Sequence, residues 1–354
     1  MNRFKKDIIF PKNLKLKRGL NIALVGSGKI AFEYAKVIKS FYHKIDTIVG
    51  GNNKNKRDLI IKYKIKNDFK SFEDAIMSSK NIDAWIICTS WHKLDSHFKL
   101  SLKHKLNFII EKSMITSSAE LIKISSLLSK KEKKNFFISY NRVFYDYVPL
   151  LISILQKNSI DQININMPDP FKKILKGKKK SLKQHLILFI TSHWVSLIIK
   201  ILKILKMNID FENYIKFSQK NNKGSKTLII KIKKNKKNIP LIFSLMPNNA
   251  SNTNISIFSG KMHIQLSPIE KMKINYDLKK ITIKKQNLYK PDSYTFNVDN
   301  KYKPGFRHMY FDFIESCVLK KRQSLSGTNI DDLVDIYKIC EILKNDKEIL
   351  WKKI

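Results

Sequence analysis

The chain has 354 residues, 43% hydrophobic and 11% aromatic, which is enough for two ordinary domains and too apolar for a disordered chain. Lysine and arginine number 69 against 29 acidic residues, a net charge of +40, but only six of the 69 are arginines. Proteins that recognise nucleic acids usually rely on arginine. Lys, Ile and Asn all have A/T-rich codons, so a biased genome would produce this composition without selection for a nucleic-acid partner. We therefore expect no specific nucleic-acid partner. Of the three interpretations that we draw from this sequence, nucleic-acid binding is the least favoured.

Three cysteines, Cys88, Cys317 and Cys340, are widely spaced and form no CxxC pair. This pattern indicates neither a disulfide framework nor a zinc site, so we expect no metal and a reducing cytoplasm. Residues 1–19 read as a basic N-terminal extension without the apolar stretch of a signal peptide. The longest apolar run, 186–199, contains a histidine and is too short to span a bilayer, so we expect no membrane span.

Residues 20–140 alternate short apolar runs with amphipathic stretches. Strands are predicted at 20–25, 45–49, 84–88, 108–110 and 136–139, and helices at 29–40, 59–63, 71–78, 93–103 and 116–128. Alternation of this kind is typical of a parallel sheet with crossover helices. The predicted fold class is α/β, with a doubly wound Rossmann domain at 20–140.

After residue 140 the pattern changes. Helices are predicted at 147–156, 186–205, 306–319 and 330–343, a lysine-rich loop at 172–183, and strands at 160–167, 227–233, 241–245, 254–258, 262–266 and 281–285. Several strands in succession indicate an open, largely antiparallel sheet. Residues 141–354 are therefore expected to form a C-terminal α+β domain for substrate binding and oligomerisation.

The first motif that could carry chemistry is Gly26-Ser27-Gly28-Lys29-Ile30-Ala31, a GxGxxA between the first strand and the first helix. The first glycine permits a tight turn and the second lets the backbone approach a pyrophosphate. The helix N-terminus would then face the phosphates with free N–H groups. The predicted cofactor contacts are residues 26 to 30, namely Gly26, Ser27, Gly28, Lys29 and Ile30.

The second strand ends in Asn52, Asn53 and Lys54, with Arg57 shortly after. A site that prefers NAD usually has Asp or Glu here to bind the ribose 2′-hydroxyl. No acid is present, and Lys54 or Arg57 could pair with a 2′-phosphate. The cofactor is therefore NADP or NAD, with NADP favoured; the alternative is that these lysines are only a solvated loop.

Three further features lie where a Rossmann domain binds its ligands. Glu111-Lys112 follows the strand at 108–110, and a lysine there could transfer a proton if its pKa is lowered. Asn141-Arg142 follows the last strand and could bind a substrate anion, or form a structural salt bridge. His193 lies on an otherwise apolar helix and could be catalytic or simply a core histidine.

The segments ALVGSGKIA, IIEKSMITSSAELIKI and FISYNRVFYDYV, followed by a helix histidine, together resemble the Gfo/Idh/MocA oxidoreductases. Members of surface-polysaccharide pathways are the most similar. The resemblance implies hydride transfer between nicotinamide and a hydroxyl or keto carbon of a sugar or sugar nucleotide. It implies catalytic Lys112 and His193, a homodimer or homotetramer, additional substrate contacts from Asn141 and Arg142, and additional cofactor contacts from Thr89, Ser90 and Glu111.

Three positions depart from the family pattern. Ser113 replaces the proline after the lysine, Phe189 replaces the aspartate four residues before the histidine, and Val143 replaces a second arginine. These departures motivate a second interpretation, a catalytically impaired member that acts as a nucleotide-binding or regulatory protein.

Overall fold

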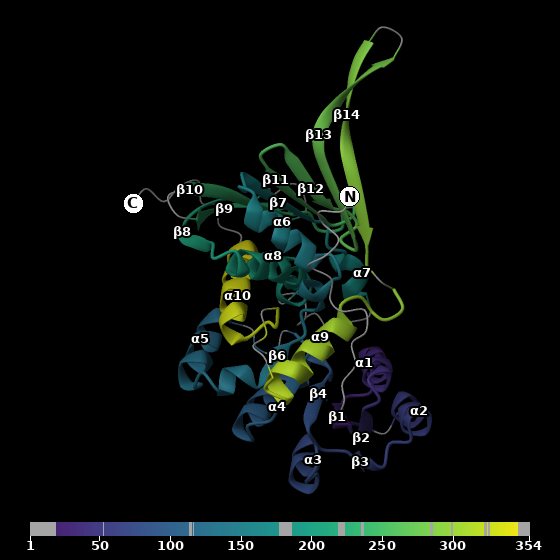
Figure 1. The fold of residues 1–354 in the computed structure, drawn as a ribbon. Coiled ribbons are helices and arrows are strands. Elements are labelled where there is room, and N and C mark those ends of the chain that lie inside the picture. The colour runs from purple at the N-terminus through teal and green to yellow at the C-terminus, as the bar shows by residue number, and fades with distance from the viewer. Residues whose placement is uncertain are drawn as a thin grey trace. The chain divides into compact units, whose positions relative to one another are not determined.

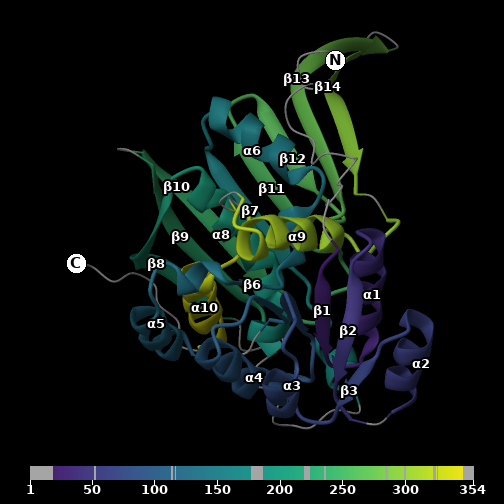
Figure 2. The same cartoon turned by 60° about the horizontal axis from the view of Figure 1, so that its bottom comes forward.

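The computed structural model describes residues 19–51, 53–112, 115, 117–176, 186–218, 224–234, 237–283, 286–298, 300–321, 324 and 326–345. These residues form two compact units. The first contains 19–145 and 300–337, and the second contains 146–298 and 338–345. Figure 1 shows the elements of both along the chain, and Figure 2 shows them from a second direction.

The first unit is built on a six-stranded parallel sheet with the strand order β3-β2-β1-β4-β5-β6. Its strands are β1 (Asn21–Val25), β2 (Lys44–Val49), β3 (Asn67–Phe69), β4 (Ala84–Ile87), β5 (Phe108–Ile110) and β6 (Phe136–Ile138). The helices between them are α1 (Lys29–Ser40), α2 (Lys54–Tyr63), α3 (Phe72–Ser78), α4 (Trp91–Lys103) and α5 (Ser118–Leu127). The strand residues are almost continuously buried, as expected when helices cover both faces of a parallel sheet.

The first unit also takes in a segment from late in the chain. Helix α9 (Phe306–Phe313) and the π-helical turn Ile314–Val318 belong to it, as does the start of α10 (Ile330–Lys344). The Phe306 ring packs on Tyr34 of α1 with 4.7 Å between ring centroids. Because this packing ties α9 to α1, the compact units differ from the predicted continuous domains at 20–140 and 141–354.

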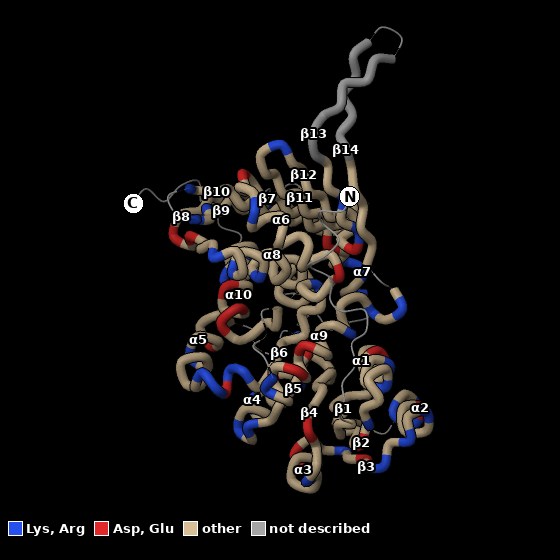
Figure 3. The backbone as a smooth tube through the Cα atoms, viewed as in Figure 1, with Lys and Arg blue, Asp and Glu red and all other residues tan. Residues whose placement is uncertain are grey.

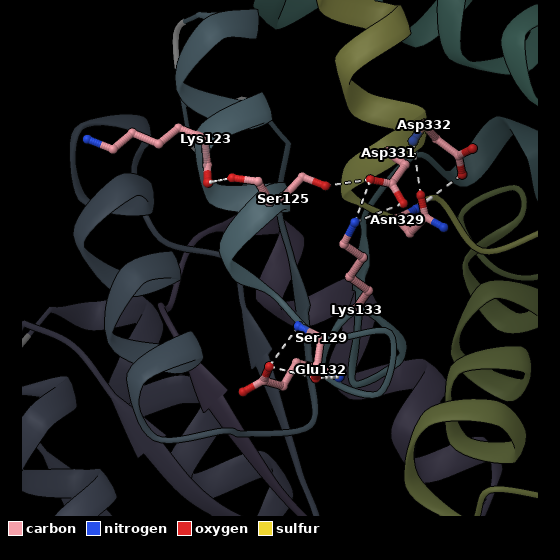
Figure 4. A network of polar contacts seen from close by, with 9 residues as sticks. Lys123, Ser125, Ser129, Glu132, Lys133, Asn329, Asp331 and Asp332 are labelled. Carbon is pink, nitrogen blue, oxygen red and sulfur yellow. Dashed lines mark hydrogen bonds and ion pairs between the residues drawn. The ribbon is translucent and has the colours of Figure 1, made fainter.

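Side-chain contacts also attach α10 to the first unit (Figure 4). Asn329 and Asp332 cap its N-terminus reciprocally, each side chain accepting from the other's backbone N–H at 2.9 and 3.2 Å. Asp331 accepts hydrogen bonds from Ser125 of α5, at 2.5 Å, and from Lys133, at 3.0 Å. The start of α10 is therefore fixed to the helical layer beside β6.

The second unit is built on an eight-stranded sheet with the order β14-β13-β12-β11-β7-β10-β9-β8. Strands β7 and β10 are parallel and the other neighbours are antiparallel. The strands are β7 (Gln162–Met167), β8 (Asn208–Ser218), β9 (Lys226–Lys234), β10 (Lys237–Leu245), β11 (Asn254–Ser259), β12 (Met262–Leu266), β13 (Lys271–Ile283) and β14 (Gln286–Asn297). Buried and half-buried residues alternate along β7, which leaves one face of the strand for the helices. The predicted fold class, a Rossmann sheet followed by a largely antiparallel sheet, is confirmed.

Three helices belong wholly to the second unit: α6 (Val148–Lys157), α7 (Phe171–Leu175) and α8 (Ser192–Ile204), the last preceded by a π-helical turn at Ile187–Thr191. The prediction of a loop from residue 172 is wrong for 172–175, because Phe171–Leu175 forms a helical turn after Pro170. Ile187–Ile204 is the one helix in the described ranges that is long and apolar enough to cross a membrane. Of that stretch 61% is buried inside the protein, so the expected absence of a membrane span stays a prediction.

Lysine and arginine are distributed over most elements of both units (Figure 3). They occur on α2, on α4, on the segment after α5 and on β9, among other places. Residues 1–18 of the predicted basic extension lie outside the described residues.

Candidate active site

The turn between β1 and α1 has the geometry that the glycine motif predicts. Gly26 has φ of 115°, and a Cβ there would lie 2.6 Å from the carbonyl oxygen of Cys88, the residue after β4. Both conditions require glycine. Gly28 caps α1 without a side chain, and a Cβ built on it would meet nothing within 4 Å. The N-terminus of α1 therefore faces open space, with exposed Lys29 and half-buried Ile30 in its first turn.

Asn53 connects the glycine turn to the end of β2. Its amide donates to Ser27 Oγ at 3.0 Å, and its Oδ1 accepts from the backbone N–H of Lys56 at 2.9 Å, which caps α2. Lys54 is the first residue of α2 and is exposed. The loop predicted to bind the ribose is therefore held by Asn53 and presents exposed Lys54, whereas Asn52 lies outside the described residues.

Sequence reasoning missed Lys56, whose side chain is 2% exposed. Its ammonium donates to the carbonyl oxygens of Gly50, at 2.8 Å, and Phe69, at 3.1 Å, and forms an ion pair with Asp68. A buried lysine with these partners joins the ends of β2 and β3. In a chain so rich in lysine no sequence signal separates Lys56 from its exposed neighbours.

The residues present fit a dinucleotide. The open N-terminus of α1 suits a diphosphate, and Asn53 and Lys54 stand where the adenosine ribose would lie. Beyond β4, Thr89 Oγ1 lies 3.3 Å from His97 Nδ1, and Ser90 caps α4. Burial lowers the pKa of His97 to about 4, so the ring next to Thr89 is neutral.

Glu111 and Lys112 follow β5, and both side chains are half-buried. Burial lowers the pKa of Lys112 to about 8. The carboxylate of Glu111 acts in the opposite direction, whereas Arg142 and Lys303 lower the pKa of Lys112 further. The direction of this pKa shift is the one that proton transfer by Lys112 needs, and that role stays a prediction. Ser113, the departure beside it, lies outside the described residues.

Tyr34 of α1 is fully buried and reaches the same edge of the sheet. Its hydroxyl lies 2.8 Å from Ser139 Oγ and donates to Glu111 Oε1 at 3.4 Å. Burial, with the charge of Glu111 as the second cause, raises the pKa of Tyr34 well above its usual range. A neutral phenol therefore joins α1 to the ends of β5 and β6.

Asn141 and Arg142 begin the turn after β6. The Asn141 amide is buried and donates to the carbonyl oxygen of Pro304 at 2.8 Å. Next to Pro304, Gly305 has φ of 76°, and a Cβ there would collide with the Asn141 carbonyl oxygen. The structure thus places Arg142 beside a segment, 300–305, that sequence reasoning did not connect with the site. Asn141 binds that segment, and its predicted contact with substrate stays a prediction.

His193 lies in the second unit, half-buried in the first turn of α8. Phe189, in the π-helical turn before it, is 5% exposed. Asp169, which follows β7 and is 1% exposed, accepts hydrogen bonds from Thr191 Oγ1 at 2.5 Å and Trp194 Nε1 at 2.9 Å. Asp169 therefore binds the side chains of one residue before and one residue after His193. Sequence reasoning missed this residue, whose signal is the Pro-Asp-Pro at 168–170.

Within the described ranges no group of three or more His, Cys, Asp or Glu side chains is arranged to hold a metal ion. All three cysteines are buried and free, and burial raises the pKa of the Cys88 thiol beside the glycine turn. Lys112 in the first unit and His193 in the second stay predicted catalytic residues.

Comparison with known proteins gives a consistent result. Residues 20–140 match the family model GFO_IDH_MocA, described as an oxidoreductase family with an NAD-binding Rossmann fold. No curated protein matches the sequence. Within the first unit, residues 20–140 therefore match an NAD-binding Rossmann fold.

Solved structures share the fold along nearly the whole chain. A Gfo/Idh/MocA oxidoreductase from Vibrio cholerae is 13% identical, with a TM-score of 0.66 over 92% of this chain and 98% of that one. Scyllo-inositol dehydrogenase from Lactobacillus casei, with bound NAD(H) and scyllo-inositol, is 13% identical, with a TM-score of 0.68 over 93% and 97%. Myo-inositol 2-dehydrogenase from Lactobacillus plantarum is 12% identical, with a TM-score of 0.67 over the same shares. At 12 and 13% identity these structures show that the chain shares their fold, and the family model matches residues 20–140.

Proposed function

We propose that the protein is an NAD(P)-dependent dehydrogenase that interconverts a hydroxyl and a keto group on a sugar or sugar nucleotide. The observation that carries the proposal is Lys112, a half-buried lysine with a pKa of about 8, in the same unit as an open glycine turn. The inositol dehydrogenases that share the fold act on polyols of similar chemistry.

Bound NAD(P)⁺ would supply the hydride acceptor at the carboxyl edge of the sheet. In the oxidation direction, neutral Lys112 accepts the proton of the substrate hydroxyl as the carbinol carbon loses its hydride, which leaves a carbonyl group and an ammonium. Glu111 keeps the pKa of Lys112 from falling further, and Tyr34 holds Glu111 in place. We assign His193 to substrate orientation and proton relay, with Asp169 as the residue that positions its helix turn.

The proposal extends to properties that rest on the sequence resemblance. NADP is favoured over NAD because Lys54 is exposed at the rim of the ribose edge and no acid stands there. A role in surface-polysaccharide synthesis is supported by the YNRVFY segment at 140–145. A homo-oligomer and a cytoplasmic location belong to the same proposal.

The first experiment is a fluorescence titration of the purified protein with NADPH and, separately, NADH, at moderate salt to suppress non-specific binding by the basic surface. We expect saturable micromolar binding that Gly28→Glu abolishes, because the new carboxylate fills the open space before α1. Gly19→Glu is the matched control: it adds the same group at the other end of β1, where the nearest atom is 3.9 Å away. Equal binding by both variants would contradict the proposal.

A catalytically impaired nucleotide-binding protein is the second candidate, and buried Phe189 in place of an aspartate favours it. The two candidates differ in one measurement, the reduction of cofactor on addition of sugars, sugar nucleotides and inositols. Cofactor binding without substrate-dependent reduction across such a screen would favour the second candidate.

A further inference from the structure

A cavity of about 700 Å³ lies within the first unit. Two stretches of the chain form it, residues 130–137, which lead into β6, and residues 316–331, which follow α9. Three of its lining residues are almost fully buried, at 1 to 5% exposure: Phe136, Phe137 and Cys317. Four lysines also line it, three of them exposed and the last one half-buried: Lys130, Lys134, Lys320 and Lys133. Cavities that bind small molecules have similar volumes, about 300–1,000 Å³.

The cavity lies at the edge of the parallel sheet opposite to the candidate active site. Lys130 and Lys134 precede β6, and Phe136 is the first residue of that strand. The glycine turn and Lys112, by contrast, follow the ends of β1 and β5. Because all six strands are parallel, their first residues share one edge of the sheet and their last residues share the other. A ligand in this cavity is therefore separate from a cofactor at the glycine turn and from a substrate at Lys112.

The carboxylates on or next to the two stretches are bound to protein groups. Asp331 accepts a hydrogen bond from Lys133 at 3.0 Å (Figure 4). Glu132 turns to Ser129 and accepts from its backbone N–H at 2.9 Å and from its hydroxyl at 2.7 Å. The other three acids also have partners, namely Lys321 for Glu315, Ser324 for Asp312 and the backbone N–H of Asn329 for Asp332.

The remaining lysines of the cavity have no such partner. In the part of the chain that the structure describes, Lys130, Lys134 and Lys320 form no ion pair with a carboxylate. Lys320 is held at the cavity by a neutral group, because its ammonium donates to Asn135 Oδ1 at 2.9 Å. The only ion pair of a lining lysine is therefore that of Lys133 among the described residues. The cavity has an excess of positive charge, which attracts anions.

We propose that this cavity binds a small molecule that carries phosphate groups. A phosphate group has about two negative charges and three strong acceptor oxygens, so one group can accept hydrogen bonds from several ammonium groups. Lysine binds phosphate as a point charge on a flexible side chain, which suits three exposed lysines around an apolar floor. A concave site of this volume favours a small molecule over a nucleic acid, which needs a longer basic groove. The inference goes beyond the proposed dehydrogenase function and does not depend on it.

The test is a calorimetric titration of the full chain with D-fructose 1,6-bisphosphate and with inorganic pyrophosphate. A salt concentration of about 150 mM suppresses binding by the overall charge of the protein. We expect saturable binding at one site per chain, with a dissociation constant below about 100 μM for at least one probe, and no binding of neutral D-fructose. Absence of saturable binding by both probes overturns the inference.

The Gly28→Glu protein is titrated in parallel, because its new carboxylate fills the open space before α1 at the other edge of the sheet. We expect the probes to bind this variant as tightly as they bind the unaltered protein. Loss of binding in Gly28→Glu would assign the probes to the cofactor site and would also overturn the inference.

Further variants assign the binding to the cavity. Lys320→Met and Lys134→Met should each weaken binding of the tighter probe about 10-fold, because each removes a charge-assisted hydrogen bond, and Lys320→Arg should keep most of the affinity. Lys123→Met is the matched control, since Lys123 is exposed on α5 and does not line the cavity. Equal weakening by Lys320→Met and Lys123→Met overturns the inference, because net charge alone would then explain binding. A short single-stranded oligonucleotide that binds more tightly than both probes, and more weakly to Lys320→Met, would assign the cations to nucleic acid and overturn it as well.

Discussion

The hydroxyl groups of Tyr34 and Ser139, 105 residues apart in the sequence, lie 2.8 Å from each other. One is on the helix after the glycine turn and the other directly follows β6. Because the Tyr34 hydroxyl also donates to Glu111, this contact links the cofactor turn to the candidate proton-transfer group. The phenol is neutral throughout the physiological range, so the link does not depend on pH.

Tyr34→Phe should lower the free energy of unfolding by about 1–3 kcal/mol, because it leaves buried Ser139 and half-buried Glu111 without a partner. Urea denaturation measures the change. Tyr42→Phe is the control, since Tyr42 is 90% exposed and its hydroxyl should contribute little. Equal stabilities of the two variants would show that the Tyr34 hydroxyl is not a structural link.

The lowered pKa of Lys112 predicts how kcat/KM should depend on pH. With a pKa of about 8, Lys112 is mostly protonated at pH 7, and only the neutral form can accept a proton. For oxidation, kcat/KM should rise with pH and level off above about 8; for reduction, which needs the ammonium, it should fall above that pH. Lys112→Ala should lower turnover by roughly 10² or more and spare cofactor affinity, whereas Lys103→Ala, at an exposed site, should change neither.

Glu111→Gln tests whether the pKa of Lys112 determines the pH profile of the reaction. Glu111 raises the pKa of Lys112, so its removal should move the rise in oxidation to lower pH. The glutamine keeps an acceptor for Tyr34, which limits structural change. If the rise moves to higher pH, or does not move, Lys112 is not the group whose titration sets the profile.

Lys54 and Lys56 stand two residues apart and should behave differently. Lys54→Met should weaken NADPH binding about 10-fold and leave NADH binding unchanged, because Lys54 is exposed after β2, where the ribose would lie, and only NADPH carries a 2′-phosphate there. Lys56→Met should lower the free energy of unfolding by about 1–3 kcal/mol, since two carbonyl oxygens lose their donor. If Lys54→Met binds both cofactors like the unaltered protein, the preference for NADP is wrong.

Asp169→Ala should lower the free energy of unfolding by about 1–3 kcal/mol, because the Thr191 hydroxyl and the Trp194 indole lose a buried acceptor. It should also lower kcat more than it raises KM, if the turn that carries His193 loosens. Asp161→Ala, which breaks an exposed ion pair with Lys237, should cost less than about 1 kcal/mol. A variant of Asp169 with unchanged stability would show that the buried bonds are unimportant.

Local patterns in the sequence predicted the first unit well. The helix at Lys29–Ser40 has the predicted bounds, and Ser117 caps α5 by accepting from the Glu120 N–H at 3.1 Å. These features depend on residues close together in the chain. Strand β3 was missed because two of its three residues, Asn67 and Asp68, are polar and exposed, and β8 because its residues do not alternate between buried and exposed.

The candidate site was predicted only where it depends on a local motif. Glu111-Lys112 could be placed from the strand before it and from the family resemblance. Lys303 could not be placed in this way, since nothing near it in the sequence shows that Asn141 binds its neighbour Pro304. Asn141 and Pro304 are 163 residues apart in the sequence. The roles of Asp169 and Lys56 were hidden for the same reason: burial decides them, and burial is set by the whole fold.

The return of residues 300–337 to the first unit has a consequence for protein synthesis. The ribosome delivers the Rossmann strands first, but Phe306 and Tyr310, which cover the apolar side of α1, emerge only after the whole second sheet. The first unit therefore stays incompletely covered while residues 146–298 of the second unit are translated. A nascent chain stalled near residue 150 would expose that apolar surface to chaperones, and a fragment ending there should aggregate when it is expressed alone.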